Sequence, residues 1–206
     1  MKAGAVLQNN LATNGGGVYV GGTFTMSGGS KITNNTVTSG SGTGGGGGVY
    51  VTTGTFTMNN GTMSGNTASS TSGSGLGGGV YVNAGSSGGT FNMYGGGISA
   101  NTAKTNGGGV YNNSTFRVGG TANVSGNTKT DGTTRSNAYI TSSANITLGT
   151  GTNVPSSGME IWAQTARPDT VLVQSVTNGT VVTYFHADEI GKSVVFDVNV
   201  LKIINN

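Results

Sequence analysis

"GGGVYV" occupies residues 15 to 20, 46 to 51 and 77 to 82, and a variant, "GGGVYN", occupies residues 107 to 112. The four copies begin 31, 31 and 30 residues apart. A regular spacing of this size is typical of chains built from stacked units, each of which forms one small supersecondary structure. The spacing therefore predicts a repeat architecture.

Two further runs follow each copy. The second run is "GTFTM" at 22 to 26 and 54 to 58, "GTFNM" at 89 to 93 and "STFRV" at 114 to 118; the third begins at 32, 63, 98 and 124 as "ITNNT", "MSGNT", "ISANT" and "VSGNT". Apolar and polar residues alternate, and Gly, Asn, Ser or Thr bound each run, which is the pattern of short strands. Three strands in each repeat predict an all-β protein, a right-handed parallel β-helix (solenoid) of about five three-strand coils.

Stacked coils predict columns of equivalent residues, because neighbouring strands of a sheet lie about 4.8 Å apart. We expect a buried aromatic column made of Phe24, Phe56, Phe91 and Phe116, which Ile146 continues. At one corner, side-chain amides in a second column can satisfy the backbone groups that the bend exposes. That column would consist of Asn35, Asn66, Asn101 and Asn127.

The repeat changes toward the C-terminus. "SNAYI" at 136 to 140 and "NITL" at 145 to 148 replace the first two runs, and longer apolar-rich runs follow Pro155. An open stack exposes strand edges and its apolar columns, so it needs a cover. We therefore predict parallel β-helix repeats over residues 1–150 and a C-terminal capping β region over residues 151–206, whose strand order stays open.

Composition narrows the function classes. The net charge is +3 and the basic residues are dispersed, so we expect no nucleic-acid partner. No apolar run approaches the roughly 20 residues of a membrane span, so we expect no membrane insertion of this segment. The chain has no cysteine, which excludes disulfides and thiolate metal sites.

Carboxylates are absent from residues 1 to 130, and Asp131 is the first acidic residue. Enzymes that cleave polysaccharides need carboxylates as general acid, nucleophile or calcium ligand. The first four coils offer none, so we predict a non-enzymatic protein with no catalytic residues, no metal and no cofactor. A carbohydrate-active β-helix fragment, with a polysaccharide lyase or hydrolase site near Asp131, Arg135 or the cap, stays the alternative.

The pairing of "GGGVY" with an apolar-x-x-Asn-Thr run resembles the repeats of the polymorphic outer-membrane protein family, and the units as a whole resemble β-helical repeats of large bacterial surface proteins. The likeness covers roughly residues 5 to 150. In "GGGVY" the third Gly stands where the family has Ala. In the apolar-x-x-Asn-Thr run the first residue is Ile, Met or Val, where the family has Phe. The resemblance implies a secreted or wall-associated protein, often an adhesin or autotransporter passenger.

Strict alternation in the first run directs its valines inward and one tyrosine of each coil outward. An uncovered tyrosine column would be a platform for a glycan or a protein. The corner loops at 37 to 45, 68 to 76 and 83 to 88 either cover this column or bind in its place. The binding residues expected are Tyr19, Tyr50, Tyr81, Tyr111 and Tyr139.

The threonine rows, the polar cluster at 186 to 189 and Trp162 are the remaining candidate groups. Thr23 with Thr25 and Thr55 with Thr57 form Thr-x-Thr rows, which also occur in ice-binding β-solenoids, but Arg117 interrupts the array. Ice binding is therefore a further alternative. His186, Asp188 and Glu189 could bind a metal or transfer protons, but we expect them in a solvated loop, and we expect Trp162 in the core of the cap.

The sequence thus predicts an extracellular or cell-surface module, an adhesin or stalk segment. Its expected partner is a glycan or protein of a host or neighbouring cell, and self-association at the open N-terminal end is a further possibility.

Overall fold

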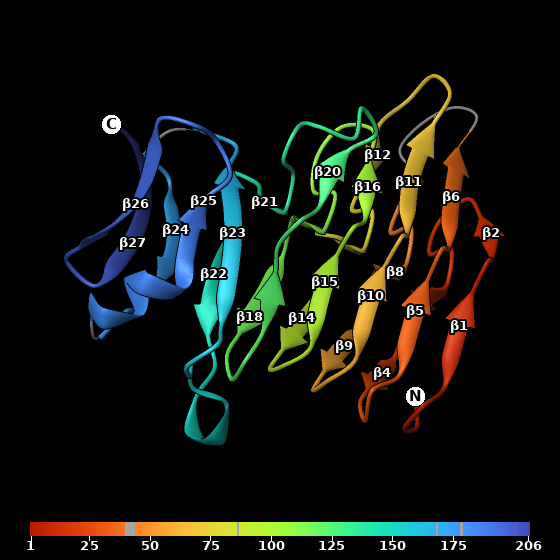
Figure 1. The fold of residues 1–206 in the computed structure, drawn as a ribbon, viewed down its shortest axis with the longest axis horizontal. Helices are drawn as coiled ribbons and strands as arrows, with labels where there is room; N and C mark the ends of the chain where they lie inside the picture. The colour runs from red at the N-terminus through yellow and green to blue at the C-terminus, as the bar shows by residue number, and fades with distance from the viewer. Residues whose placement is uncertain (40–43, 86, 168, 178) are drawn as a thin grey trace.

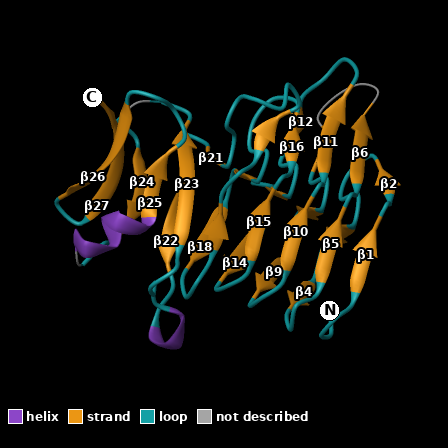
Figure 2. Ribbon diagram, viewed as in Figure 1, coloured by secondary structure: helices purple, strands orange, loops and turns teal. Residues whose placement is uncertain are grey.

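The computed structural model describes residues 1–39, 44–85, 87–167, 169–177 and 179–206 and shows a parallel β-helix, which confirms the predicted fold class. Coils stack from the N-terminus at one end of the molecule to the C-terminus at the other (Figure 1). Strands dominate, and the helices among the described residues are the short 3-10 segments η1 (Gly151–Asn153) and η2 (Gly179–Tyr184) (Figure 2). No described helix is long and apolar enough to span a membrane.

The three predicted runs form three walls, and in each wall the equivalent strands of successive coils pair in parallel. The first wall contains β3 (Val18–Val20), β8 (Val49–Val51), β13 (Val80–Val82), β17 (Val110–Asn112) and β21 (Ala138–Ile140). The second wall contains β4 (Thr23–Met26), β9 (Thr55–Met58), β14 (Thr90–Met93), β18 (Thr115–Val118) and β22 (Asn145–Leu148). The third wall contains β1 (Val6–Gln8), β5 (Lys31–Thr33), β10 (Thr62–Ser64), β15 (Gly97–Ser99) and β19 (Asn123–Val124).

The structure adds a fourth wall that the three-strand interpretation missed. After the asparagine corner, Thr67 pairs with Thr36 of one neighbouring coil and with Thr102 of the other, so residues expected in a corner form a ladder of their own. This wall contains β2 (Leu11–Ala12), β6 (Thr36–Ser39), β11 (Thr67–Ser70), β16 (Thr102–Ala103) and β20 (Thr128–Lys129). The two-residue strands β7 (Gly44–Gly45) and β12 (Gly75–Leu76) pair beside it.

The C-terminal region first continues the helix and then caps it. β23 (Glu160–Thr165) pairs in parallel with β19 through its first residues and with β21 through its last, which joins the third and first walls. β25 (Phe185–Ala187) adds to β23, and β24 (Val171–Gln174) adds to the second wall. The antiparallel pair β26 (Lys192–Asp197) and β27 (Val200–Asn205) covers the end, with β27 against β24.

The core is the predicted stack of apolar columns. Phe56, Phe91 and Phe116 are fully buried, whereas Phe24 at the open end is partly buried. Neighbouring phenylalanine rings have centroids 4.8 to 5.4 Å apart, and Ile146 follows Phe116 in register. One continuous column therefore holds the coils together through dispersion and burial.

The three glycines of each repeat serve two needs, a left-handed backbone conformation and close contact between coils. Gly46 has a φ of +68°, in the left-handed region that favours glycine. A Cβ on Gly47 would overlap the carbonyl oxygen of Gly78 in the next coil, and a Cβ on Gly48 would lie 2.8 Å from the carbonyl oxygen of Gly79. The triplet is required because the backbone turns sharply and the coils touch there.

The corner asparagines form the predicted ladder. From Asn35 to Asn127, each donates its main-chain N–H and its Nδ2 to the Oδ1 of the asparagine one coil further on, at 2.8 to 3.0 Å. Asn10 extends the ladder at the N-terminal end, and Asn137 accepts the bonds of Asn127. All corner amides between these ends are fully buried and hydrogen-bonded, so the bend costs little free energy.

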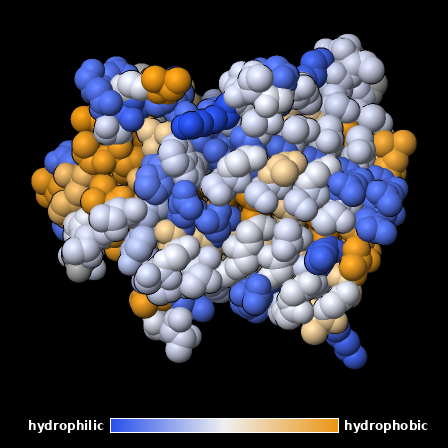
Figure 3. Space-filling view, viewed as in Figure 1, coloured by the Kyte–Doolittle hydropathy of each residue, from blue (hydrophilic) through white to orange (hydrophobic). Residues whose placement is uncertain are grey.

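Apolar surface is concentrated at the two ends. On the face shown in Figure 3 the middle is mostly neutral in hydropathy and the strongly apolar residues lie toward the ends of the stack. Exposed apolar residues include Val6 and Leu11 at the N-terminal end and Phe196 and Val198 at the C-terminal end. These side chains stand where the regular stacking of coils stops.

Candidate functional site: the tyrosine column and its groove

The outward tyrosines form one column on the first wall. They pair strand by strand, and neighbouring ring centroids lie 5.0 to 5.3 Å apart. In the second coil Val49 and Val51 are buried and Tyr50 is intermediate, so the predicted alternation is confirmed. The column consists of Tyr19, Tyr50, Tyr81, Tyr111 and Tyr139.

The middle of the column is covered. Tyr81 is only 8% exposed, whereas Tyr19 at the N-terminal end is 59% exposed. β7 passes so close that a Cβ on Gly45 would lie 2.5 Å from the ring of Tyr81 and 3.2 Å from that of Tyr50. The continuous uncovered strip that alternation alone allows is therefore not formed.

β7 belongs to one of the corner segments named as possible covers, residues 37 to 45. Residues 40–43 of that segment and residue 86 of the segment at 83 to 88 lie outside the described residues. Glycine at position 45 lets the main chain approach the rings closely.

Burial changes the acidity of the central tyrosines. Desolvation, assisted by the charges that Tyr50 and Tyr111 would carry, raises the pKa of Tyr81 from 10.0 to about 12. Desolvation likewise raises the pKa values of Tyr50 and Tyr111. These hydroxyls therefore stay protonated and neutral under ordinary conditions.

Stacking also determines which ring faces a ligand can reach. The three central rings have a tyrosine ring on each side, whereas Tyr19 and Tyr139 end the column and have one each. Beyond Tyr139 the next strand brings Gln164 into the equivalent position. The column thus ends with one aromatic face beside an amide.

A groove of about 650 Å³ opens at this end of the column, and its lining includes Lys129, Arg135, Tyr139, Gln164 and Glu189. Its volume is within the range of ligand sites in proteins. Two cations, an amide and an aromatic ring can donate hydrogen bonds to hydroxyl and carbonyl groups and pack against an apolar face. Among these five, the sequence interpretation named Tyr139 as a binding residue and Arg135 and Glu189 as parts of alternative sites, and it missed Lys129 and Gln164.

Trp162 lies beside this groove and not in the core of the cap, contrary to the sequence expectation. Alternation along β23 buries Ile161 and Ala163 and turns Trp162 outward. His186 stacks on the indole with centroids 4.8 Å apart, and the Cζ of Arg135 lies 5.1 Å from the indole centroid, within cation–π range. The indole N–H donates to Oε1 of Glu160 at 2.6 Å.

The polar turn that begins at His186 also differs from the expected solvated loop. His186 belongs to β25, and Asp188 is 3% exposed, while Glu189 is exposed and pairs with Lys192. Burial raises the pKa of the Asp188 carboxyl, although hydrogen bonds from Asn137 oppose this rise. The described residues hold no group of three His, Cys, Asp or Glu side chains that could bind a metal ion.

The second candidate row lies on the second wall. The threonines at 23, 55, 90 and 115 pair in register, and the row through Thr25 and Thr57 continues as Asn92 and Arg117. Arg117 donates from Nη1 to Oδ1 of Asn92 at 3.0 Å. The regular Thr-x-Thr pattern therefore ends after two coils, as the sequence indicated.

A repeat signal for the missed groove residues was present in the sequence. "AQT" at 163 to 165 pairs residue by residue with "AYI" at 138 to 140. Aligning these triplets would have predicted a further strand of the first wall and placed Gln164 beyond Tyr139. The position of Arg135 had no such signal, because it lies in the loop between two strands.

A scan of protein-family models, a search of curated proteins and a search of solved structures each found no match to this chain. The fold and the chemistry of the site are thus the basis for a functional conclusion.

Proposed function

We propose that this chain is a non-enzymatic module of an extracellular or cell-surface protein, in which a rigid β-helical stalk presents a glycan-binding site at the Tyr139 groove. The observation that carries the proposal is the end of the tyrosine column. There Tyr139 lines a groove together with Lys129, Arg135 and Gln164. The surface location rests on the resemblance of the repeats to those of bacterial surface proteins.

The lining of the groove suits a sugar. The C–H face of a pyranose ring packs on an aromatic ring, while its hydroxyl groups exchange hydrogen bonds with amide and charged side chains. Tyr139 provides the ring, and Gln164 occupies the neighbouring position in the next coil. The same wall supplies both residues, so their spacing is set by strand pairing.

The scaffold favours binding because it is already ordered. The phenylalanine, asparagine and tyrosine columns each cross several coils. The rings of the first and third stack from coil to coil, and the asparagines hydrogen-bond from coil to coil. A site held on such strands loses little conformational entropy when a ligand binds, so more of the contact energy appears as affinity.

The carboxylates near the groove already serve the chain itself. Asp188 accepts hydrogen bonds from Asn137, and Glu189 pairs with Lys192. Asp131 accepts hydrogen bonds from two threonines in its own loop, which lower the pKa of its carboxyl to about 2. These roles support binding over turnover, because a general acid needs an accessible carboxyl with a raised pKa.

Binding to an array of cell-surface glycans tests this function. Tyr139→Ser with Gln164→Ala should lower binding at least tenfold, because the aromatic ring and the amide are removed together. Tyr19→Ser, at the opposite end of the column, is the matched control and should leave binding unchanged.

Three results would contradict the proposal. One is that neither end of the column affects binding in folded protein. Another is cell binding that persists after the cells are deglycosylated, which would indicate a protein partner. The third is release of product from pectin or alginate, with or without calcium, that depends on Asp131 or Asp188; it would favour the carbohydrate-active alternative.

A further inference from the structure

A second cavity lies on the second wall, where the helix passes into its cap. β24 extends this wall by one strand, but its pairing with β22 ends at Thr147 and Gln174. The chain then turns away through Ser175, whose φ is +58°. Leu148 therefore pairs with Val118 of β18 but with no residue of β24. A cavity of about 730 Å³ opens there among the second wall, residues 149 to 155 and η2.

A chain of hydrogen bonds breaks off at this cavity. On the outer face Asn92 donates to Oγ1 of Thr57 at 3.4 Å, and Arg117 donates to Asn92 at 3.0 Å. Thr147 follows Arg117 in register, yet its Oγ1 is buried and has no hydrogen-bond partner in the described structure. A buried hydroxyl without a partner costs free energy and needs an explanation.

The described residues that line the cavity carry only positive charge. Arg117 lines it, and no aspartate or glutamate is among its described lining residues. Ion pairs in the described part of the chain join Lys192 to Glu189 and Lys202 to Asp197, so Arg117 has no carboxylate partner there. An arginine has five N–H donors, and Asn92 accepts from Nη1 alone.

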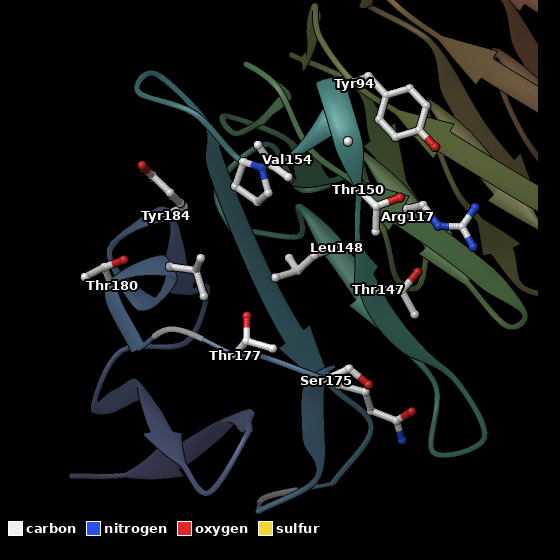
Figure 4. Close-up of a pocket in the computed structure, with 15 residues that line it drawn as sticks. Tyr94, Arg117, Thr147, Leu148, Thr150, Val154, Ser175, Thr177, Thr180 and Tyr184 are labelled. Carbon is white, nitrogen blue, oxygen red and sulfur yellow. The ribbon is translucent and has the colours of Figure 1, made fainter.

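Hydroxyl groups surround this charge, and apolar side chains complete the lining. In the view of Figure 4 the hydroxyl oxygens of Tyr94, Thr147 and Thr150 lie toward the side of the cavity where Arg117 is drawn. Leu148 and Val154 lie in the middle, and η2 contributes Tyr184 from the opposite side. Pro155 also lines the cavity. The site thus combines donors for an anion with apolar surface.

We propose that this cavity binds a carboxylate-bearing sugar unit, such as a uronic acid, with the carboxylate between Arg117 and Thr147. A carboxylate is an acceptor at both oxygens, so it takes N–H donors from the guanidinium. It also takes the O–H of Thr147 once a rotation about χ1 turns this buried hydroxyl into the cavity. The sugar ring packs against Leu148 and Val154, and its hydroxyls meet Tyr94 and Thr150. A cavity of this volume accommodates one or two sugar rings.

The site is separate from the Tyr139 groove, because it lies on a different wall and the two cavities have no described lining residue in common. Its test is titration calorimetry of the whole chain with glucuronate and galacturonate, with glucose and galactose as neutral partners of the same shape, and with a sulfated galactose. Binding of the two uronates and much weaker binding of the neutral and sulfated sugars is the expected result.

Three variants locate the binding. Arg117→Gln removes the charge but keeps an N–H donor for Asn92, and should lower uronate affinity at least tenfold. Thr147→Val preserves shape and should lower it several-fold while the melting temperature stays equal or rises, because an unpartnered buried hydroxyl is lost. Thr25→Val, in the same row two coils before Asn92, is the control and should change nothing.

Absence of uronate binding up to millimolar concentration would overturn the proposal, as would equal binding of the neutral sugars. Preference for the sulfated sugar would contradict the carboxylate assignment. Unchanged affinity in both Arg117→Gln and Thr147→Val would exclude this cavity as the site. Tyr139→Ser should leave uronate binding intact, so failure here and failure of the groove proposal are distinguishable.

Discussion

Asp188 terminates the asparagine ladder: its Oδ2 accepts the main-chain N–H of Asn137 and its Oδ1 accepts the Nδ2 of the same residue, both at 2.7 Å. Every earlier step of the ladder uses one amide oxygen for both bonds. A carboxylate from the cap therefore completes a corner that runs through all the coils, and it ties the cap to the repeats.

We expect Asp188→Leu to destabilise the protein by roughly 2 to 5 kcal/mol, because two buried donors of Asn137 lose their acceptors. Asp188→Asn is the matched control and should cost much less, because the new amide oxygen can accept both bonds from Asn137. In the preceding step of the ladder, the single Oδ1 of Asn137 accepts both bonds from Asn127 in the same way. Urea unfolding of the two variants measures the difference. Equal stability of the two would show that the hydrogen bonds to Asn137 contribute little.

The raised pKa of the Asp188 carboxyl predicts a pH dependence. A carboxyl that holds its proton more tightly in the folded state stabilises the fold fully below its unfolded pKa, and this contribution is lost as pH rises through the folded pKa. The unfolding free energy of the wild type relative to Asp188→Asn should therefore fall as pH rises above about 4. A relative stability that increases over this range would mean that the bonds from Asn137 outweigh desolvation.

Tyr81 predicts a second transition at alkaline pH. Its pKa of about 12 in the folded protein exceeds the ordinary 10.0, so the folded state disfavours the phenolate. The associated stability is present below pH 10 and is lost toward pH 12, by up to roughly 3 kcal/mol. Tyr81→Phe should remove this part of the alkaline loss. If the unfolding free energies of wild type and variant decrease equally between pH 10 and pH 12, Tyr81 ionises as freely as an exposed tyrosine.

Phe91 lies at the centre of the aromatic column, with ring neighbours at 4.8 and 5.1 Å. Phe91→Ala should lower the unfolding free energy by roughly 3 to 5 kcal/mol, because the cavity is enclosed by rings above and below and cannot collapse easily. Thr25→Ala on the outer face is the control and should change it by less than about 0.5 kcal/mol. A small effect of Phe91→Ala would mean that the coils close the gap by sliding together.

Glycine substitutions test the close approach of the coils. Gly47→Ala should prevent folding or severely destabilise the protein, because its Cβ would overlap the carbonyl oxygen of Gly78. Gly97→Ala should be tolerated, since nothing lies within 4 Å of the corresponding Cβ. Circular dichroism and melting of the two variants compare them. Normal folding of Gly47→Ala would show that neighbouring coils can separate locally.

Much of the fold could be predicted because its determinants are local and periodic. The phenylalanine column, the asparagine ladder and the outward tyrosines each follow from one residue type recurring at one place in each repeat. Parallel stacking turns that recurrence in sequence into contact in space. The fourth wall was missed because "TVTS" at 36 to 39 and "TASS" at 67 to 70 each hold one apolar residue, so no alternation of apolar and polar residues marks them as strands.

The candidate sites were less predictable because they form where the repeat breaks. The ladder passes from Asn127 to Asn137, only ten residues on, and then to Asp188, 51 residues later. Arg135 and Trp162 come together across that irregular region. No spacing in the sequence encodes these contacts, so the side chains of Arg135 and Trp162 could not be placed together in advance.

The sequence by itself determined the stacked coils, the inward and outward faces of each strand and the residues of each column, because alternation and period act through neighbours along and between strands. Tertiary structure alone decided that β7 covers Tyr81, that Asp188 is buried against Asn137 and that β24 ends at Gln174 and leaves a cavity. Those outcomes depend on where corners and cap segments cross the walls, and this is set by three-dimensional packing between residues whose separation in the chain follows no repeat.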